Sequence, residues 1–229
     1  MRAALQLAVL VSAATLACVV LSPQFDRLTD ASFAWHMVQH LALLWIVPLL
    51  AILAQPFGLF RRVVGKQYVA ALVRGLRPLH AIAHPFVAFT CVVGYLWIMH
   101  FSSIYESALE HPEVHAAEHG LLLLAGTLFW LPVLAPPPLR PLGFPVRIFY
   151  LLVCMPQCAL LAFALDAARE PLYPHYVQTL GRMALADQRN GAAVMWIGGS
   201  LVIFIALLAT LGLWAHREGG AEPVAAQAV

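Results

Sequence analysis

The sequence predicts an all-α membrane protein, a bundle of about six transmembrane helices with both termini in the cytoplasm. Of its 229 residues, 62% are hydrophobic and 10% are charged, and the mean hydropathy is +0.82. Soluble domains carry about 25% charged residues, so this composition indicates that the solvent is mainly lipid. Several apolar runs also approach or reach the roughly 20 residues that a spanning helix needs.

The predicted helices are separated by proline, glycine and charged residues, which end helices. They cover residues 3–21, 33–54, 79–100, 114–134, 145–166 and 192–215. We interpret the first run as a retained helix, because it is long and Thr15-Leu16-Ala17-Cys18 is a poor cleavage site for a signal peptide. Residues 1–216 are then a single transmembrane domain, and residues 217–229 are a disordered cytoplasmic tail.

The distribution of lysine and arginine predicts the orientation. Membrane proteins keep these residues in their cytoplasmic segments. With both termini inside, the inner segments hold Arg2, Arg61, Arg62, Lys66, Arg74, Arg77, Arg140, Arg147 and Arg217. The outer loops hold only Arg27, Arg169, Arg182 and Arg189. These basic residues are spread thinly, so we expect the lipid bilayer and no nucleic acid as a partner.

Two pairs of histidines at i,i+4 are the strongest candidates for a functional site in the sequence. His36 and His40 open the second run, and His115 and His119 open the fourth. The spacing puts both rings of a pair on one helix face. Bilayer-spanning helices rarely carry imidazoles, because a buried polar group without a partner is costly. In the predicted topology both pairs and His100 share one depth near the outer surface, which predicts a metal site.

Neutral imidazole binds copper, zinc and iron well, and thioether sulfur favours Cu(I). The predicted metal ligands are His36, His40, His100, His115 and His119. The predicted accessory residues are Met37, Met99, Glu118, Asp187, Gln188 and Met195. Glu118 or Asp187 would accept the second ring N–H of a ligand. The alternatives are that the histidines only bridge helices by hydrogen bonds, and that Asp187 only favours a helix N-terminus.

The segment Cys154-Met155-Pro156-Gln157-Cys158 places two thiols on one helix face, beside a proline that frees a backbone carbonyl. Thiolate and thioether are soft ligands, so Cys154 and Cys158 are candidates for a Cu(I) relay. Alternatively, both are small buried hydrophobic residues. Because all four cysteines lie in apolar segments, we do not expect a disulfide framework.

Other polar and aromatic residues have simpler interpretations. His80 and His84 are expected to cap or anchor the third span at the inner interface. Seven aromatic residues near the span ends are interpreted as interfacial belts: Trp35, Tyr95, Trp130, Tyr150, Tyr173, Trp196 and Trp214.

Several blocks of the chain resemble the caa3-type CtaG family of bacterial integral-membrane cytochrome c oxidase assembly proteins. These blocks are residues 33–56, 84–89, 96–100, 104–105, 115–119, 128–133, 171–174 and 187–196. The likeness covers roughly residues 33–199. Carried over by matching position, the family's histidines are His36, His40, His84, His100, His115 and His119. Two departures are the count of six spans, where an additional one is frequent, and Met99, where an aromatic residue is common.

The resemblance implies a non-enzymatic role in the biogenesis of a haem–copper oxidase. Copper would be handled in the bacterial inner membrane, with the metal site towards the periplasm. Oxidase subunits or another copper chaperone would be the partners. Three alternatives remain open. One is a transporter or proton path, although the polar residues gather on one side and form no file across the bilayer. His115-x-x-Glu118-His119 matches the short pattern of inverted zinc peptidases, with Glu118 as general base. A b-type cytochrome would instead use two histidines as axial haem ligands.

Overall fold

The computed structural model describes residues 3–55, 83–136 and 141–219, together with residues 75, 81 and 139. All regular structure in these residues is helical. In chain order the elements are α1 (Ala3–Val20), α2 (Pro23–Ala31), α3 (Phe33–Leu41), the π-helical turn η1 (Ala42–Ile46), α4 (Val47–Leu53), α8 (Pro85–Phe101), α9 (Ser103–Glu110), α10 (Pro112–Leu134), α11 (Phe144–Asp166), α12 (Pro174–Leu180), the 3₁₀ turn η2 (Gly181–Met183) and α13 (Ala184–Gly219).

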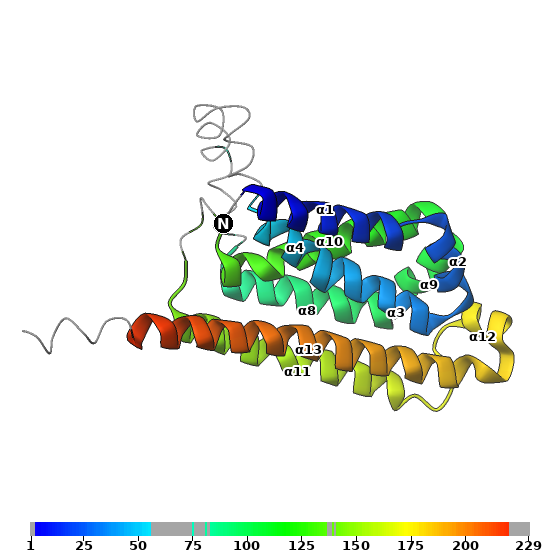
Figure 1. Cartoon of the computed structure of the whole chain (residues 1–229). Coiled ribbons are helices and arrows are strands. Elements are labelled where there is room, and N and C mark those ends of the chain that lie inside the picture. Colours follow the sequence, from blue (N-terminus) through cyan, green and yellow to red (C-terminus); the bar gives the residue numbers. More distant parts are fainter. Residues whose placement is uncertain are drawn as a thin grey trace, which may run out of the picture.

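Five helical segments are long and apolar enough to cross a membrane, and a sixth is added if α8 and α9, which are bent by 71°, form one span. This confirms an all-helical protein with five to six candidate spans. The start of α1 and the end of α13 lie at one end of the bundle, and α2, α9 and α12 lie at the other (Figure 1). Which end faces the cytoplasm stays a prediction.

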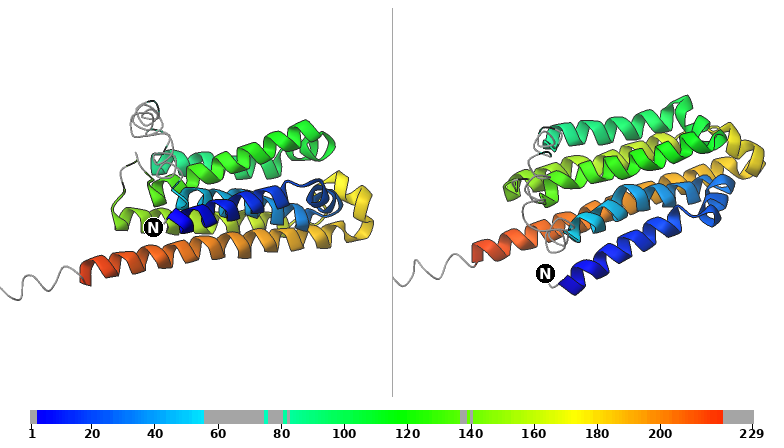
Figure 2. Two further views of the ribbon diagram at one scale, coloured as in Figure 1. Left: turned by 45° about the horizontal axis from the view of Figure 1, so that its top comes forward. Right: turned by 90° about the horizontal axis from the view of Figure 1, so that it is seen from above.

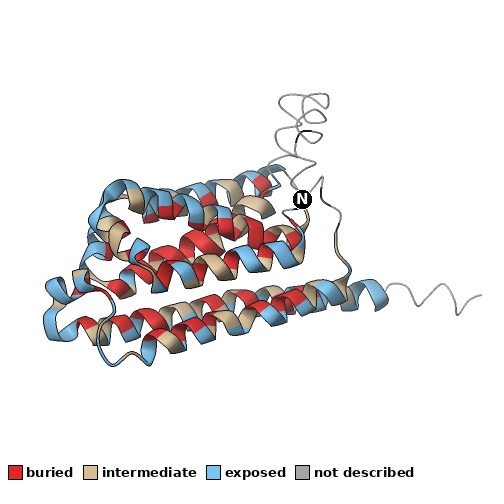
Figure 3. Cartoon of the chain, turned by 180° about the vertical axis from the view of Figure 1, so that it is seen from behind, coloured by how far each residue is buried: buried red, intermediate tan, exposed pale blue. Residues whose placement is uncertain are grey.

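The helices pack as a bundle whose outer surface is apolar. Helix α13 packs along α11 and α3, α10 packs on α8, η1 and α4, and α1 packs on α4 (Figure 2). Buried residues lie on the faces between helices (Figure 3). Large apolar side chains are nevertheless exposed on the outside, among them Phe86, Phe149, Phe163, Ile197 and Leu213. This outward apolar surface is what contact with lipid tails requires.

The second span changes its helical pitch at η1, directly after α3. Pro48 has no N–H, so the carbonyl of Leu44 cannot accept the usual i−4 hydrogen bond. A Cβ at Gly126 of α10 would collide with this carbonyl oxygen. The carbonyl of Trp45 accepts a hydrogen bond from Trp130 Nε1 at 2.9 Å. The π turn therefore lets α10 approach the second span closely at the level just below the histidines.

Three short helices, α2, α9 and α12, form what we call the cap. Helix α12 contacts both α2 and α9, at the end of the bundle away from the start of α1 and the end of α13. His175 Nε2 of α12 lies 3.0 Å from the Asp30 carboxylate of α2. The backbone N–H of His175 donates to Glu106 Oε1 of α9 at 2.8 Å. These contacts hold the cap together over the histidine pairs.

Some sequence-based expectations on element bounds and aromatic positions needed revision. The last helix runs from Ala184, well before residue 192. Trp130, Tyr150 and Tyr173 are buried, so their assignment to interfacial belts is wrong. Each reaches a backbone carbonyl inside the protein, which satisfies its polar atom without water.

Other expectations concern residues near the edges of the described segments. The side chain of His84 accepts a hydrogen bond from the Phe86 N–H and caps α8, as predicted, whereas His80 lies outside the described residues. Helix α13 continues to Gly219, and residues 220–229 of the predicted tail also lie outside them. All four cysteines are free.

Candidate metal centre

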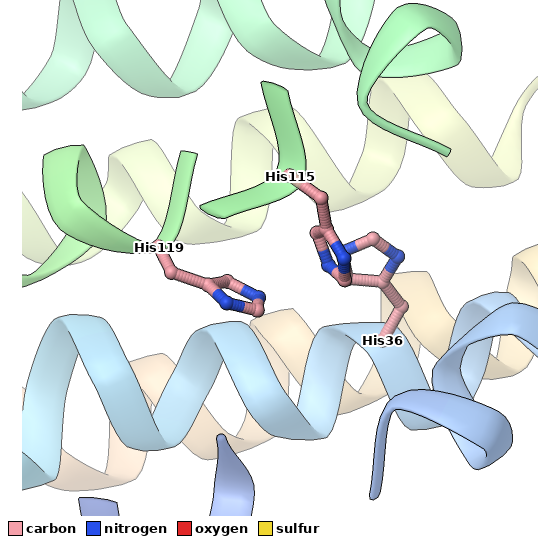
Figure 4. A group of neighbouring side chains, drawn as sticks. All are labelled: His36, His115 and His119. Carbon is pink, nitrogen blue, oxygen red and sulfur yellow. The ribbon is translucent and has the colours of Figure 1, made fainter. Parts of the chain in front are cut away.

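The two histidine pairs face each other across the contact between α3 and α10. The ring centroids of His36 and His40 are 4.3 Å apart, and those of His115 and His119 are 4.2 Å apart. The rings of His36 and His115 approach to 5.1 Å. Figure 4 shows the imidazoles of His115 and His119 projecting from α10 towards α3, where His36 points back at them. The i,i+4 spacing therefore brings four rings from two helices into one cluster.

Two overlapping groups in this cluster could hold a metal ion. The first is His36, His115 and His119, and the second is His36, His40 and Glu118. In each group, one ligand atom from every residue lies within 4.8 Å of the others. Because bonds from a metal to imidazole nitrogen are about 2.0–2.1 Å long, small side-chain rotations would bring these atoms to one ion. We call these five residues the histidine cluster.

Several polar atoms of the histidine cluster have no hydrogen-bond partner in the described part of the chain. They are His36 Nε2, His40 Nε2, His115 Nε2 and both carboxylate oxygens of Glu118. Glu118 is 2% exposed, and its oxygens lie 3.8 Å from His36 Nε2 and 3.5 Å from His40 Nε2. Leaving one buried polar group unsatisfied costs about 1–3 kcal/mol. A cation bound among these atoms would remove that cost, so the residues fit a metal ion.

The hydrogen bonds of His36 determine which of its nitrogens is free. Its Nδ1 lies 3.0 Å from the Tyr176 hydroxyl and 3.1 Å from the Tyr105 hydroxyl. The Tyr176 hydroxyl donates its proton to the Thr29 carbonyl at 2.9 Å, so its oxygen is left to accept from Nδ1–H. The lone pair then lies on Nε2, the atom that faces Glu118. Such bonds to the second nitrogen orient a ligand histidine.

His119 is oriented through its other nitrogen. Its Nε2–H donates to Gln39 Oε1 at 3.0 Å. Gln39 Nε2 donates to the Val20 carbonyl at 2.6 Å and to Asp26 Oδ1 at 3.1 Å, so the amide has its oxygen towards the histidine. Nδ1 of His119 is thereby left with the lone pair that a metal would need.

His100 lies beside the histidine cluster and belongs to neither ligand group. Its ring centroid is 6.4 Å from that of His40. Its Nδ1–H donates to the Leu96 carbonyl at 2.8 Å, and its Nε2 is unpaired. The Tyr173 hydroxyl donates to the His100 carbonyl at 3.1 Å. Burial raises the pKa of the Tyr173 phenol, which keeps it protonated as a donor.

Among the described residues, Asp187 and Gln188 make no hydrogen bond to the histidine cluster and bond other groups instead. Asp187 Oδ1 accepts from Ser32 Oγ at 2.8 Å, and its Oδ2 accepts from the Ala34 N–H at 3.4 Å. Asp187 thus joins the first turn of α13 to the start of α3. Gln188 Nε2 donates to the Leu165 carbonyl at 2.9 Å and so holds α13 to the end of α11.

The predicted sulfur-bearing residues differ in how they lie relative to two small cavities near the cluster. Three of them line a cavity of about 30 Å³ next to the cluster: Met37, Met195 and Cys158. His40 and His100 line the same cavity. Cys154 lines a neighbouring cavity that also touches Cys158, and Met99 is buried in α8 and lines neither.

An open pocket on the other side of the cluster leads to the surface of the cap. It has a volume of about 330 Å³ and lies between α2, α9 and α10. Its charged and titratable lining residues are Asp26, Asp30, Glu110, Arg27 and the half-buried His115, so three carboxylates face one guanidinium. Because carboxylates raise the local concentration of cations, this pocket is suited to admit a metal ion to His115.

Comparison with known proteins assigns the chain to a family. The sequence model of the cytochrome c oxidase caa3 assembly factors (Caa3_CtaG) matches residues 3–217. The chain belongs to this family. The structure therefore shows a Caa3_CtaG protein whose buried histidine cluster could hold a metal ion.

Curated relatives of this Caa3_CtaG chain include uncharacterized mycobacterial proteins. The chain is 25% identical over 208 residues to one from Mycobacterium leprae and 24% identical over 204 residues to one from Mycobacterium bovis. The alignments cover 82% of the chain and 31% of each relative. The chain thus spans less than a third of the length of these relatives. No solved structure matches it.

Three residues that support the histidine cluster were missed by sequence reasoning. Gln39 lies between the two histidines of α3, and as a polar residue in an apolar run it carried the same signal as they did. Tyr105 and Tyr176 come from the cap, 69 and 140 residues from His36 along the chain. An aromatic residue near a span end gave no signal that its hydroxyl would reach a buried imidazole.

Proposed function

We propose that this Caa3_CtaG protein binds copper at the histidine cluster and helps to deliver it to a haem–copper oxidase. The observation that carries the proposal is the set of unpaired, buried nitrogen and oxygen atoms contributed by α3 and α10. Family membership implies involvement in the assembly of caa3 cytochrome c oxidase. The haem–copper oxidases that such a factor would serve need copper during assembly.

Copper is favoured over other ions by the donor set. Imidazoles bind zinc and copper, and among divalent first-row metals copper binds a given nitrogen site most tightly. Methionine and cysteine sulfur lies directly beside the cluster, and soft sulfur ligands favour Cu(I). Protein zinc sites use cysteine thiolates as their sulfur ligands, not methionine thioethers. The thioethers of Met37 and Met195 beside the cluster therefore support copper.

The charge distribution supports delivery from the periplasmic side. In the sequence, lysine and arginine are concentrated between α4 and α8 and between α10 and α11. The described ends of these helices lie at the end of the bundle where α1 begins and α13 ends, and the positive-inside rule would place that end in the cytoplasm. The acidic pocket of the cap would then open to the periplasm. A copper ion would pass from this pocket to His115 and the remainder of the cluster.

The zinc peptidase and the b-type cytochrome find less support in the geometry. As a peptidase base, Glu118 would need to face a substrate and a water, whereas its oxygens face His36 and His40. Pockets that bind organic cofactors have volumes of about 300–1,000 Å³. The cavity between His40 and His100 has a volume of about 30 Å³, too small for a porphyrin held by these two rings.

Metal analysis of the protein purified in detergent tests the proposal. Wild type loaded with Cu(II) should retain one equivalent at the cluster after dialysis against a weak chelator. The double variant His36→Ala/His115→Ala should lose it, because His36 belongs to both candidate groups and His115 is a further ligand of the first. The exposed histidines His111 and His216 serve as a control pair. Retention of copper by the cluster variant at the wild-type level would overturn the assignment.

The same variants test the role in assembly. In a bacterium whose own copy is deleted, wild type and the control His111→Ala/His216→Ala should restore the copper content of the terminal oxidase. His36→Ala/His115→Ala, which disrupts both candidate groups, should not, although it is present in the membrane at equal abundance. Full restoration by the cluster variant would show that assembly does not depend on this site.

A further inference from the structure

The cavity beside the histidine cluster is lined by an unusual combination of side chains. Four elements contribute its histidine and sulfur-bearing side chains: α3 with Met37 and His40, α8 with His100, α11 with Cys158 and α13 with Met195. Its volume of about 30 Å³ suits a single ion or two to three waters, since a water needs about 10–15 Å³ by this measure. This volume is small for an organic ligand, whose pockets measure about 300–1,000 Å³.

Two of the lining residues are unpartnered imidazoles. Nε2 of His40 and Nε2 of His100 have no hydrogen-bond partner in the described part of the chain, and the residues are 6% and 3% exposed. His100 has its Nδ1–H fixed on the Leu96 carbonyl, so its Nε2 carries the lone pair. The cavity is therefore lined by two buried imidazole nitrogens that no described group satisfies with a hydrogen bond, and a bound cation could coordinate both.

The remaining donors are soft and uncharged. Met37, Met195 and Cys158 supply two thioethers and a thiol, and the other described residues that line the cavity are apolar. None of the lining residues is acidic. A buried divalent ion would lack a compensating negative charge here, which is very costly in an apolar setting. A monovalent soft ion has less charge to compensate and prefers sulfur and imidazole ligands.

We propose that this cavity is a second metal site, selective for a monovalent soft cation such as Cu(I). It deepens the proposed function and rests on it only for the identity of the natural ion. His40 borders both the cluster and the cavity, so an ion can exchange between them by replacing ligands around one shared imidazole. The ion keeps its oxidation state in this exchange. Cys158, which also lines the next cavity with Cys154, extends the sulfur donors towards the middle of α11.

Silver(I) is a redox-inert probe for such a site, and equilibrium titration of the full chain in detergent counts the ions it retains. The exposed thiols Cys18 and Cys91 are first replaced by serine, so that they do not bind silver. This protein should bind two equivalents of Ag(I) and one of Zn(II). Met37→Leu/Met195→Leu should lose one Ag(I) and keep the Zn(II). The matched control Met155→Leu, on α11 and away from the cavity lining, should keep both Ag(I) ions.

The outcomes separate this proposal from the proposed function. His36→Ala/His115→Ala, which disrupts both candidate groups, should lose Zn(II) but still retain one Ag(I). Absence of Zn(II) binding in the parent protein would overturn the cluster and leave the silver result standing. An Ag(I) count that is the same in parent and Met37→Leu/Met195→Leu would overturn the second site. If that variant also loses Zn(II), X-ray absorption of the silver-loaded parent decides, because a silver environment without sulfur contradicts the proposal.

Discussion

Single hydrogen bonds decide which nitrogen of each imidazole is available to a metal. His36 gives its Nδ1 to the tyrosine hydroxyls, and His119 gives its Nε2 to Gln39. Neither supporting group touches the position an ion would occupy, yet each fixes a ring and its tautomer. Removing such a supporting group typically costs about 10–100-fold in metal affinity.

Gln39→Leu should weaken Zn(II) or Cu(II) binding at the histidine cluster by about 10–100-fold. The substitution removes the acceptor for His119 Nε2–H, so that ring is free to turn or to change tautomer. Competition with a chromophoric chelator measures the affinity. Gln6→Leu is the matched control, because Gln6 is also buried and hydrogen-bonded but contacts Gln55, far from the cluster. Equal losses in both variants would contradict a specific role of Gln39.

Tyr105→Phe/Tyr176→Phe should weaken metal binding by about tenfold, the lower end of the range for a supporting group. Without the two hydroxyls, His36 Nδ1 loses its partners and the lone pair is no longer confined to Nε2. Tyr150→Phe provides the control, since the Tyr150 hydroxyl is buried and donates to the Phe129 carbonyl. Unchanged affinity in the double variant would show that the tyrosines serve packing alone.

Breaks in the helices position the cluster. The π turn η1 adjusts the second span below its histidines, and the 71° bend between α8 and α9 brings Tyr105 to a stacked contact with His100, with centroids 5.8 Å apart. Ser102 accepts the Ile104 N–H at 3.2 Å and caps α9 at this bend. Each break lies where α3 and α10 or the cap must meet, so the irregular elements are those that build the site.

Gly126→Ala should lower the free energy of unfolding by about 1–3 kcal/mol, the usual cost of forcing extra atoms into a packed interior. The new methyl group would meet the Leu44 carbonyl oxygen, which is backbone and cannot turn away. Gly120→Ala in the same helix is the control. Nothing lies within 4 Å of its added Cβ, so it should be neutral or stabilise by up to about 1 kcal/mol. Thermal unfolding in detergent compares them; equal midpoints would contradict the close contact.

Sequence could locate the regular elements but not their breaks. Apolar runs reveal membrane spans because the thickness of the bilayer sets the length of a spanning helix. Two residues at i,i+4 lie on the same face in any α-helix, so the histidine pairs could be recognised from spacing alone. The π turn, the bend after α8 and the short helices α2 and α12 depend on contacts between distant segments. The same is true of Tyr105 and Tyr176, whose partner His36 is supplied by tertiary structure. The helices of the cap lay in stretches where only loops were expected.

The molecule as a whole is polarised from one end to the other. Both described chain ends lie at one end of the bundle, and the acidic pocket and the cap lie at the other (Figure 1). The histidine cluster lies just beneath the cap, between this pocket and the sulfur-lined cavity. A metal ion can therefore reach the cluster from one surface without crossing the full thickness of the bundle.

A cysteine placed on the cap should react from the periplasm. In a protein with Cys18 and Cys91 replaced by serine, Thr179→Cys should be labelled in intact cells by a maleimide that cannot cross membranes. Thr179 is exposed on α12. His216→Cys, exposed near the end of α13, should be labelled only after lysis, because the positive-inside rule places that end in the cytoplasm. The reverse pattern would place the cluster on the cytoplasmic side.

The position of a bound ion tests the histidine cluster most directly. Crystals of the protein grown with copper should give an anomalous difference peak between α3 and α10, about 2.0–2.1 Å from imidazole nitrogens of both helices. His36 should be among the ligands, because it belongs to both candidate groups. A fully occupied peak elsewhere, with these imidazoles bound only to one another or to water, would contradict the assignment of this cluster as the metal site.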